Sequence, residues 1–152
     1  MNIHEYLRQN NIEFSLHEHV PAYTAQTLAA EEHVTGHSVA KVVIVKADDA
    51  FYMCVLPAPR MLDVTKVARA VGAKAVRLAD EKQIALLFPD VEVGAEPPFG
   101  NLYNLPTLVD KRLAERGEIV FQGGSHMEAV RMKFADYARL AQPKVAEIAV
   151  ER

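Results

Sequence analysis

The sequence has one cysteine, no long apolar run and no excess of basic residues, and each absence excludes a class of protein. Cys54 is the single cysteine in 152 residues. The chain therefore cannot form an internal disulfide, and a reducing cytoplasm is the expected compartment. No run approaches the ~18 apolar residues of a membrane span, and the first eleven residues lack the apolar segment of a signal peptide. The net charge is -3, so a nucleic-acid partner requires a local basic patch.

The composition is that of a protein with a packed core. Half of the residues are hydrophobic and 24% are charged, which is too few charges for a disordered chain. The length fits one core, so we expect residues 1–152 to form a single domain.

Apolar periodicity and turn signals predict both helices and strands. The predicted helices cover 2–10, 25–32 after a Thr24 cap, 64–71 after an Asp63 cap, 81–88 after an Asp80 cap, and 134–142. The predicted strands cover 13–19, 40–46, 50–57, 74–79, 104–110, 118–124 and 128–133, with the polar segment 111–116 as a connection. This order lacks a regular strand–helix alternation. It predicts an α+β fold with a mixed, curved, barrel-like sheet of about six to seven strands and helices packed outside.

Lys41 stands at the head of the predicted strand AKVVIVK. It shares a strand face with Val43 and Val45, so its ammonium must reach water or find an anion. An edge-strand lysine that discourages aggregation is the first interpretation. A lysine at the rim of a pocket, placed to hold a phosphate or carboxylate, is the second.

The stretch VEVGAEPPFG, residues 91–100, predicts a stiff loop. Gly94 permits positive φ and close approach of a ligand, whereas Pro97 and Pro98 have fixed φ and no N–H. We expect free amides at Gly94, Ala95 and Glu96, which can stabilise an oxyanion. A rigid connection with no ligand is the alternative.

These segments together resemble the YbaK/ProX family of aminoacyl-tRNA deacylases over about residues 20–140. The resemblance depends on Lys41, on a G-x-x-x-P element met by Gly94 and Pro98 with Pro97 adjacent, and on the order of segments between them. HVPAYTAQTLA resembles the family segment that places a threonine at the pocket, here Thr24. GGSHMEAVRM resembles a later pocket segment, with Gly123, Gly124 and His126. Val42 stands where some members have an asparagine, which argues against the alanyl-tRNA(Pro)-specific subgroup.

The resemblance implies a free-standing editing hydrolase that cleaves the ester of mischarged tRNA without a metal or other cofactor. Lys41 and Gly94 are the implied catalytic residues; Thr24, Pro97, Pro98, Gly124 and His126 are the implied substrate-binding residues. The implied partner is the 3′ end of mischarged aminoacyl-tRNA, with a synthetase as a second candidate. A non-catalytic tRNA- or synthetase-binding module and a hydrolase of another ester are the competing interpretations.

Other residues have two interpretations each. His126 is either a turn histidine or a substrate contact that titrates near neutrality. Phe99 and Tyr103 either stack on adenine or belong to the core. Cys54 is interpreted as a buried small hydrophobe. The basic residues of 66–77, which are Lys66, Arg69, Lys74 and Arg77, either guide an acceptor stem or solvate a surface.

Overall fold

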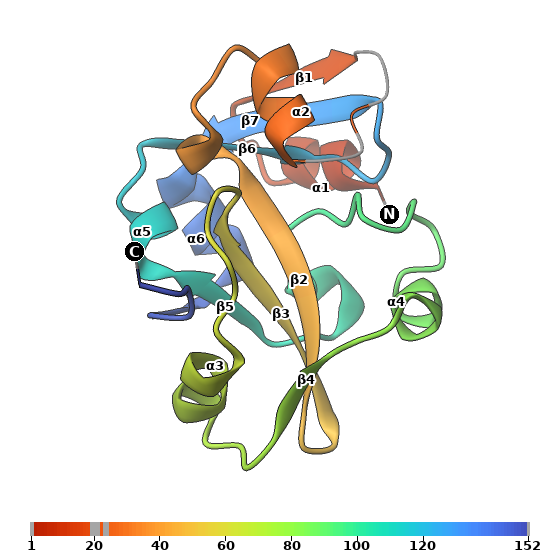
Figure 1. Cartoon of the computed structure of the whole chain (residues 1–152). Coiled ribbons are helices and arrows are strands. Elements are labelled where there is room, and N and C mark those ends of the chain that lie inside the picture. Colours follow the sequence, from red (N-terminus) through yellow and green to blue (C-terminus); the bar gives the residue numbers. More distant parts are fainter. Residues whose placement is uncertain (1, 19–21, 23–24, 152) are drawn as a thin grey trace.

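The computed structural model describes residues 2–18, 22 and 25–151, which form two β-sheets with helices around them (Figure 1). The helices are α1 (Ile3–Gln9), α2 (Ala25–Glu31), α3 (Val64–Val71), α4 (Glu81–Leu87), α5 (Lys111–Ala114) and α6 (Phe134–Ala141), with 3-10 turns η1 (Gly36–Ser38) and η2 (Gly100–Tyr103). The strands are β1 (Phe14–Glu18), β2 (Ala40–Ala47), β3 (Ala50–Pro57), β4 (Val76–Leu78), β5 (Thr107–Asp110), β6 (Glu118–Gln122), β7 (Glu128–Lys133) and β8 (Lys144–Ala146).

The two sheets differ in strand direction. The smaller sheet has the order β1-β7-β6 and is antiparallel throughout. The larger sheet has the order β4-β2-β3-β5-β8. Its β4-β2-β3 part is antiparallel and its β3-β5-β8 part is parallel. The predicted α+β class with mixed strands is confirmed, whereas closure of the strands into a barrel stays a prediction.

Local sequence signals explain where several helices begin and end. The Asp63 carboxylate accepts hydrogen bonds from two amides of the first turn of α3, and Gly72 ends that helix with φ +71. Asp80 forms a capping box with Gln83 at the start of α4. Side-chain caps of this kind satisfy amides that have no partner inside the helix. The predicted caps at Asp63 and Asp80 are confirmed, whereas the predicted Thr24 cap lies outside the described residues.

Two elements were not expected. The polar segment predicted as a connection contains α5, capped by Asp110, whose side chain accepts from the Arg112 amide. The C-terminal strand β8 pairs in parallel with β5 through Leu108–Lys144 and Val109–Val145. The described residues therefore contain eight strands, one more than the seven runs predicted as strands.

The main core lies between the sheets and holds the glycine–proline loop in place. Phe99 is fully buried, and its ring makes edge contacts with Tyr6, Phe121 and Tyr137 at centroid distances of 5.8, 5.8 and 5.1 Å. Aromatic pairs in this geometry add to the free energy gained by burying their area. The C-terminal half of the loop is thus an integral part of the core.

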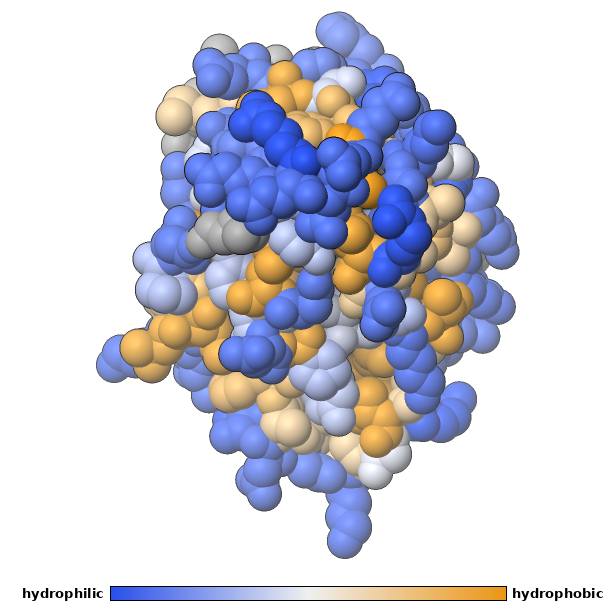
Figure 2. Space-filling view, turned by 180° about the vertical axis from the view of Figure 1, so that it is seen from behind, coloured by the Kyte–Doolittle hydropathy of each residue, from blue (hydrophilic) through white to orange (hydrophobic). Residues whose placement is uncertain are grey.

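Within the described residues, no helix is both long enough and apolar enough to cross a membrane. Figure 2 shows the rear face, where apolar residues form separate areas between hydrophilic ones.

Candidate functional site

The loop of residues 91–100 has an exposed first half and a buried second half. Residues 92–94 are exposed, whereas residues 95–100 are buried. Pro97 and Pro98 therefore lie inside the protein and fix the course of the backbone, while Gly94 faces solvent with φ +92. This is a surface-presented glycine on a rigid support, which is what the sequence predicts. The predicted roles of Pro97 and Pro98 in binding substrate stay predictions.

The expectation of free amides at Gly94 and Ala95 is wrong. The Gly94 amide donates to Glu96 Oε2 at 2.5 Å, and the Ala95 amide donates to the Glu92 carbonyl at 3.0 Å. The reason is that the Glu96 side chain folds back onto its own loop. Burial raises the pKa of the Glu96 carboxyl, while its hydrogen bonds to backbone amides and the nearby His126 oppose that rise. A carboxyl oxygen already occupies the position at the Gly94 amide where an oxyanion was expected.

The turn after β6 packs against this loop. The Glu92 amide donates to the Gly124 carbonyl at 2.9 Å, and the Gly124 amide donates to the Ala95 carbonyl at 3.0 Å. Two segments that are far apart in the sequence are thereby joined by backbone hydrogen bonds. The structure thus brings Gly94, Gly124 and His126 together, as expected if they share one site.

His126 is buried between the two segments. Its Nε2 lies 3.0 Å from the Val93 carbonyl oxygen, and its Nδ1 lies 3.3 Å from the Ala22 carbonyl oxygen. The Glu92 carboxylate lies 3.9 Å from Nε2. A carbonyl oxygen only accepts, so a neutral ring with one N–H can donate to only one of the two carbonyls. His126 is therefore a buried link between the two segments. Its predicted role in binding substrate stays a prediction.

Lys41 is half-buried at the start of β2. Burial lowers the pKa of its ammonium. Among the residues that the structure describes, the Lys41 ammonium has no hydrogen-bond or ion-pair partner. A half-buried cation with no partner is costly unless an anion joins it. The edge-strand interpretation fits only in part, because β2 pairs with β3 along its whole length and with β4 at Val45–Ala47 only.

The start of β2 lies beside β6. A parallel bridge joins Val39 to Val120, so the two segments run in the same direction from that point. Lys41 and Gln122 therefore both lie two residues beyond the bridge. Gln122 donates through Nε2 to the Ala22 carbonyl, which is also the Nδ1 neighbour of His126. The start of β2, which carries Lys41, therefore lies beside β6, the strand that ends at Gln122.

Glu96 and Gln122 are two site residues that the sequence did not identify. The Gln122 side chain is buried, and its Oε1 has no hydrogen-bond partner in the described part of the chain. For Glu96, the signal was an acid placed directly before the two prolines of the loop. For Gln122, the signal was a polar residue at the end of an apolar strand. Thr24 lies outside the described residues.

The remaining candidates are core residues or surface pairs. Phe99 is a core residue and is not available for stacking. Tyr103 is half-buried and packs against Phe88, with 4.4 Å between the two ring centroids. Burial, and to a smaller extent the negative charge of Asp90, raises the pKa of Tyr103 to about 12. Cys54 is buried, as predicted, and burial raises its pKa to about 12. The described residues contain no group of three or more His, Cys, Asp or Glu side chains placed to hold a metal ion.

Comparison with known proteins identifies the family. The model of the aminoacyl-tRNA editing domain matches residues 19–140. This chain belongs to that family. The matched region contains Lys41, Gly94, Gly124 and His126.

Curated relatives and solved structures agree with this assignment. The chain is 34% identical over 94 residues to the multifunctional Ser/Thr-tRNA deacylase ProXp-y of Escherichia coli K12. That alignment covers 61% of this chain and 56% of the relative, so the chain spans about half the length of the curated relative.

Two solved structures share the fold. Hypothetical protein APE2540 has a TM-score of 0.88 at 22% identity, covering 97% of this chain and 98% of its own. A candidate trans-editing enzyme for prolyl tRNA synthetase has a TM-score of 0.81 at 23% identity, covering 91% and 87%.

Proposed function

We propose that this chain is a free-standing deacylase that hydrolyses the ester between a wrongly attached amino acid and the terminal adenosine of tRNA. Residues 1–152 act as one domain in the cytoplasm, with the tRNA 3′ end as the substrate group. The half-buried Lys41 ammonium, which has no partner in the described structure, carries this proposal. The family match and the contacts among Gly94, Gly124 and His126 support it.

The proposed reaction is direct attack by water. The water oxygen bonds to the ester carbonyl carbon, and the π electron pair of the carbonyl moves onto the carbonyl oxygen. The oxyanion then collapses, the ribose oxygen leaves and takes up the proton that the attacking water has lost, and free amino acid and tRNA result. Lys41 holds the acylated end by charge, and the 91–94 backbone lies at the oxyanion.

Glu96 sets a condition on this reaction. Its carboxylate accepts from the Gly94 amide at 2.5 Å, so the amide reaches an oxyanion only after this hydrogen bond opens. Burial already raises the Glu96 pKa, which weakens the preference for the charged form at this position. Substrate binding beside Gly94 is therefore coupled to movement or protonation of Glu96.

The occupied Gly94 amide favours a second candidate, a module that binds the charged tRNA end or a synthetase without turnover. One experiment separates the two. Purified protein is incubated with a panel of mischarged tRNAs in the presence of chelator, and free amino acid is measured. Release above the spontaneous rate supports the deacylase, and binding without release supports the module. Adding the synthetase to the same assay tests whether docking changes the rate.

A further inference from the structure

The loop of residues 91–100 holds a carboxyl group and a backbone hydrogen-bond donor side by side. The Gly94 amide donates to Glu96 Oε2 at 2.5 Å. Glu96 is 6% exposed, whereas Gly94 is exposed. The Glu96 side chain therefore extends from the buried half of the loop to its exposed half, and its carboxyl group lies next to the exposed Gly94 backbone.

The Glu96 carboxyl group has no basic side chain to balance its charge. Burial raises its pKa, and the hydrogen bonds from loop amides and the charge of His126 offset that rise only in part. Among the described residues, neither a lysine nor an arginine forms an ion pair with Glu96. A cation at short range stabilises the charged form of a buried carboxyl group. A cationic group of a ligand would therefore be stabilising at this position.

The other charged side chains near Gly94 also favour a cation. The Glu92 carboxylate lies 3.9 Å from His126 Nε2 and accepts from the His126 amide at 3.4 Å. Glu92 and Glu96 are both acids, and the His126 ring carries at most one positive charge. With both acids ionised, these three side chains sum to zero or to a negative charge. An oxyanion at the Gly94 amide is opposed by the two acids unless a cation binds beside it.

An aminoacyl ester has the groups that match this arrangement. Its α-ammonium is a cation, and its carbonyl oxygen accepts hydrogen bonds. The two groups are joined only through the α-carbon and the carbonyl carbon, so a neighbouring carboxylate and N–H can contact both at once. When the ammonium draws the Glu96 carboxylate towards itself, the Gly94 N–H is released to the carbonyl oxygen.

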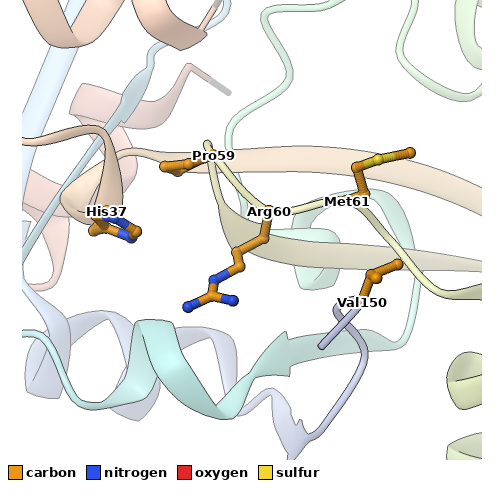
Figure 3. A pocket seen from close by; sticks show the side chains of 5 residues that line it. All are labelled: His37, Pro59, Arg60, Met61 and Val150. Atoms are coloured by element: carbon orange, nitrogen blue, oxygen red, sulfur yellow. The ribbon is translucent and has the colours of Figure 1, made fainter. Parts of the chain in front are cut away.

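Two hollows elsewhere on the described surface do not offer a free carboxylate. The hollow of about 340 Å³ in Figure 3 contains no acid among the side chains that line it, which are His37, Pro59, Arg60, Met61 and Val150. The hollow that contains Lys66 and Arg69 includes Glu147. Glu147 already accepts from Lys66 at 3.0 Å and from Lys111 at 3.3 Å. Neither hollow therefore suits an ammonium as well as Glu96 does.

A third hollow, of about 250 Å³, is the competing position for an ammonium. It lies beside the loop and is lined by Asp90 and Glu128 among other residues, but not by Gly94. Asp90 accepts from the Tyr103 hydroxyl at 3.4 Å. An ammonium in this hollow leaves the hydrogen bond between Gly94 and Glu96 in place. Glu128 is therefore the matched control for Glu96.

We propose that Glu96 binds the α-ammonium of the aminoacyl group and that this contact moves its carboxylate off the Gly94 amide. The inference rests on the proposed function, because it takes the aminoacyl ester to lie at Gly94. It makes the charged α-amine a determinant of specificity. A substrate without this charge leaves the Gly94 amide bonded to Glu96, so its carbonyl oxygen has no donor there.

The test is a binding measurement with two probes that cannot be hydrolysed. In both, an amide replaces the ester on 3′-deoxyadenosine; one carries alanine and the other carries lactic acid, whose hydroxyl replaces the α-ammonium at similar size. Calorimetry at about pH 6.5 keeps the α-amine protonated. We expect the wild type to bind the alanyl probe at least about tenfold more tightly than the lactyl probe. The ratio should fall to about threefold or less in Glu96→Gln and stay within about twofold of the wild-type ratio in Glu128→Gln.

The outcomes separate this inference from the proposed deacylase. Equal affinities of the wild type for the two probes, no measurable binding of either, or equal losses in both variants overturn the ammonium contact. Release of amino acid from mischarged tRNA still supports the enzyme in each of these cases. Preference for the alanyl probe through Glu96, in a protein that releases no amino acid, supports the contact and rejects the enzyme.

A second readout needs no variant and decides the inference even if Glu96→Gln does not fold. The amide resonance of Gly94 in the wild type reports on its hydrogen bond to Glu96. Saturation with the alanyl probe should shift this resonance, and saturation with the lactyl probe should shift it much less. Equal shifts with both probes would show that the α-ammonium does not displace the carboxylate. Circular dichroism checks the folding of both variants.

Discussion

The ring of His126 lies directly against the backbone of Gly94. A Cβ built on Gly94 would stand 3.3 Å from His126 Cε1 and 3.6 Å from Nε2, and the glycine has φ +92. Both the conformation and the contact therefore disfavour any side chain at this position.

Gly94→Ala is expected to lower the free energy of unfolding by about 1–3 kcal/mol and to lower kcat/KM at least tenfold. Gly72→Ala is the matched control, because Gly72 also has positive φ (+71) but no atom within 4 Å of a built Cβ. It should cost similar stability and leave activity unchanged. Chemical denaturation and the deacylation assay measure the two effects. Equal activity losses in both variants would mean that strain alone, and not the contact with His126, explains the effect.

Lys41→Met is expected to reduce deacylation by about 10²-fold or more, the range found when one group that stabilises transition-state charge is removed. The exposed Lys133→Met removes the same charge from the start of α6, far along the chain from Lys41, and should change the rate less than twofold. Single-turnover rates with mischarged tRNA provide the measurement. Undiminished deacylation by Lys41→Met would reject the role of this lysine.

The Lys41 ammonium also predicts a pH dependence. Burial lowers its pKa below the usual lysine value, and the charged form is the one that holds the substrate. Activity should therefore fall as pH rises through the lowered pKa, once the spontaneous hydrolysis of the ester has been subtracted. In Lys41→Arg the guanidinium keeps its charge, so any residual activity should not show this decline. The same decline in both proteins would assign the titration to another group.

Glu96→Gln tests the buried carboxylate of the loop. Burial raises the folded-state pKa of Glu96, so its contribution to stability is present below the unfolded-state pKa. That contribution is lost as pH rises through the folded-state pKa. The substituted side-chain amide can still accept from the Gly94 N–H through its oxygen but does not ionise. Relative to the wild type, the variant should gain stability between pH 4 and pH 8, as measured by urea unfolding at both values. A relative loss at pH 8 would show that the backbone amides stabilise the charged form more than burial opposes it.

Cys54 should be unreactive in the folded protein. Its thiol is buried and its pKa is raised to about 12, and the thiolate is the reactive form. Iodoacetamide at pH 8 should label the native protein negligibly and the urea-unfolded protein completely, as measured by mass spectrometry. Rapid labelling of the native protein would contradict burial of this strand.

The sequence predicts best what short-range chemistry determines. The helices after Asp63 and Asp80 were predicted because a capping side chain, a periodic apolar face and a stop signal lie within ten residues of each other. The strand β8 was missed because its three residues become a strand only by pairing with β5, more than 30 positions away. Such pairing leaves no local pattern.

In the candidate site too, some residues could be predicted from the sequence, whereas the contacts that depend on the folded path of the chain could not. Lys41, Gly94 and His126 were identified from the residues and the family resemblance, and contact between Gly94 and His126 is present in the structure. The return of Glu96 to the Gly94 amide was not foreseen, because it depends on the path imposed by the buried prolines. Free amides were inferred from backbone type alone, which does not reveal which side chain will reach them.

The ring cluster around Phe99 has a consequence for how this protein responds to heat. A loop whose far end is enclosed by Tyr6, Phe121 and Tyr137 cannot open as an independent lid while those rings remain packed. Catalytic competence and aromatic packing should therefore disappear at one temperature, in a single cooperative event.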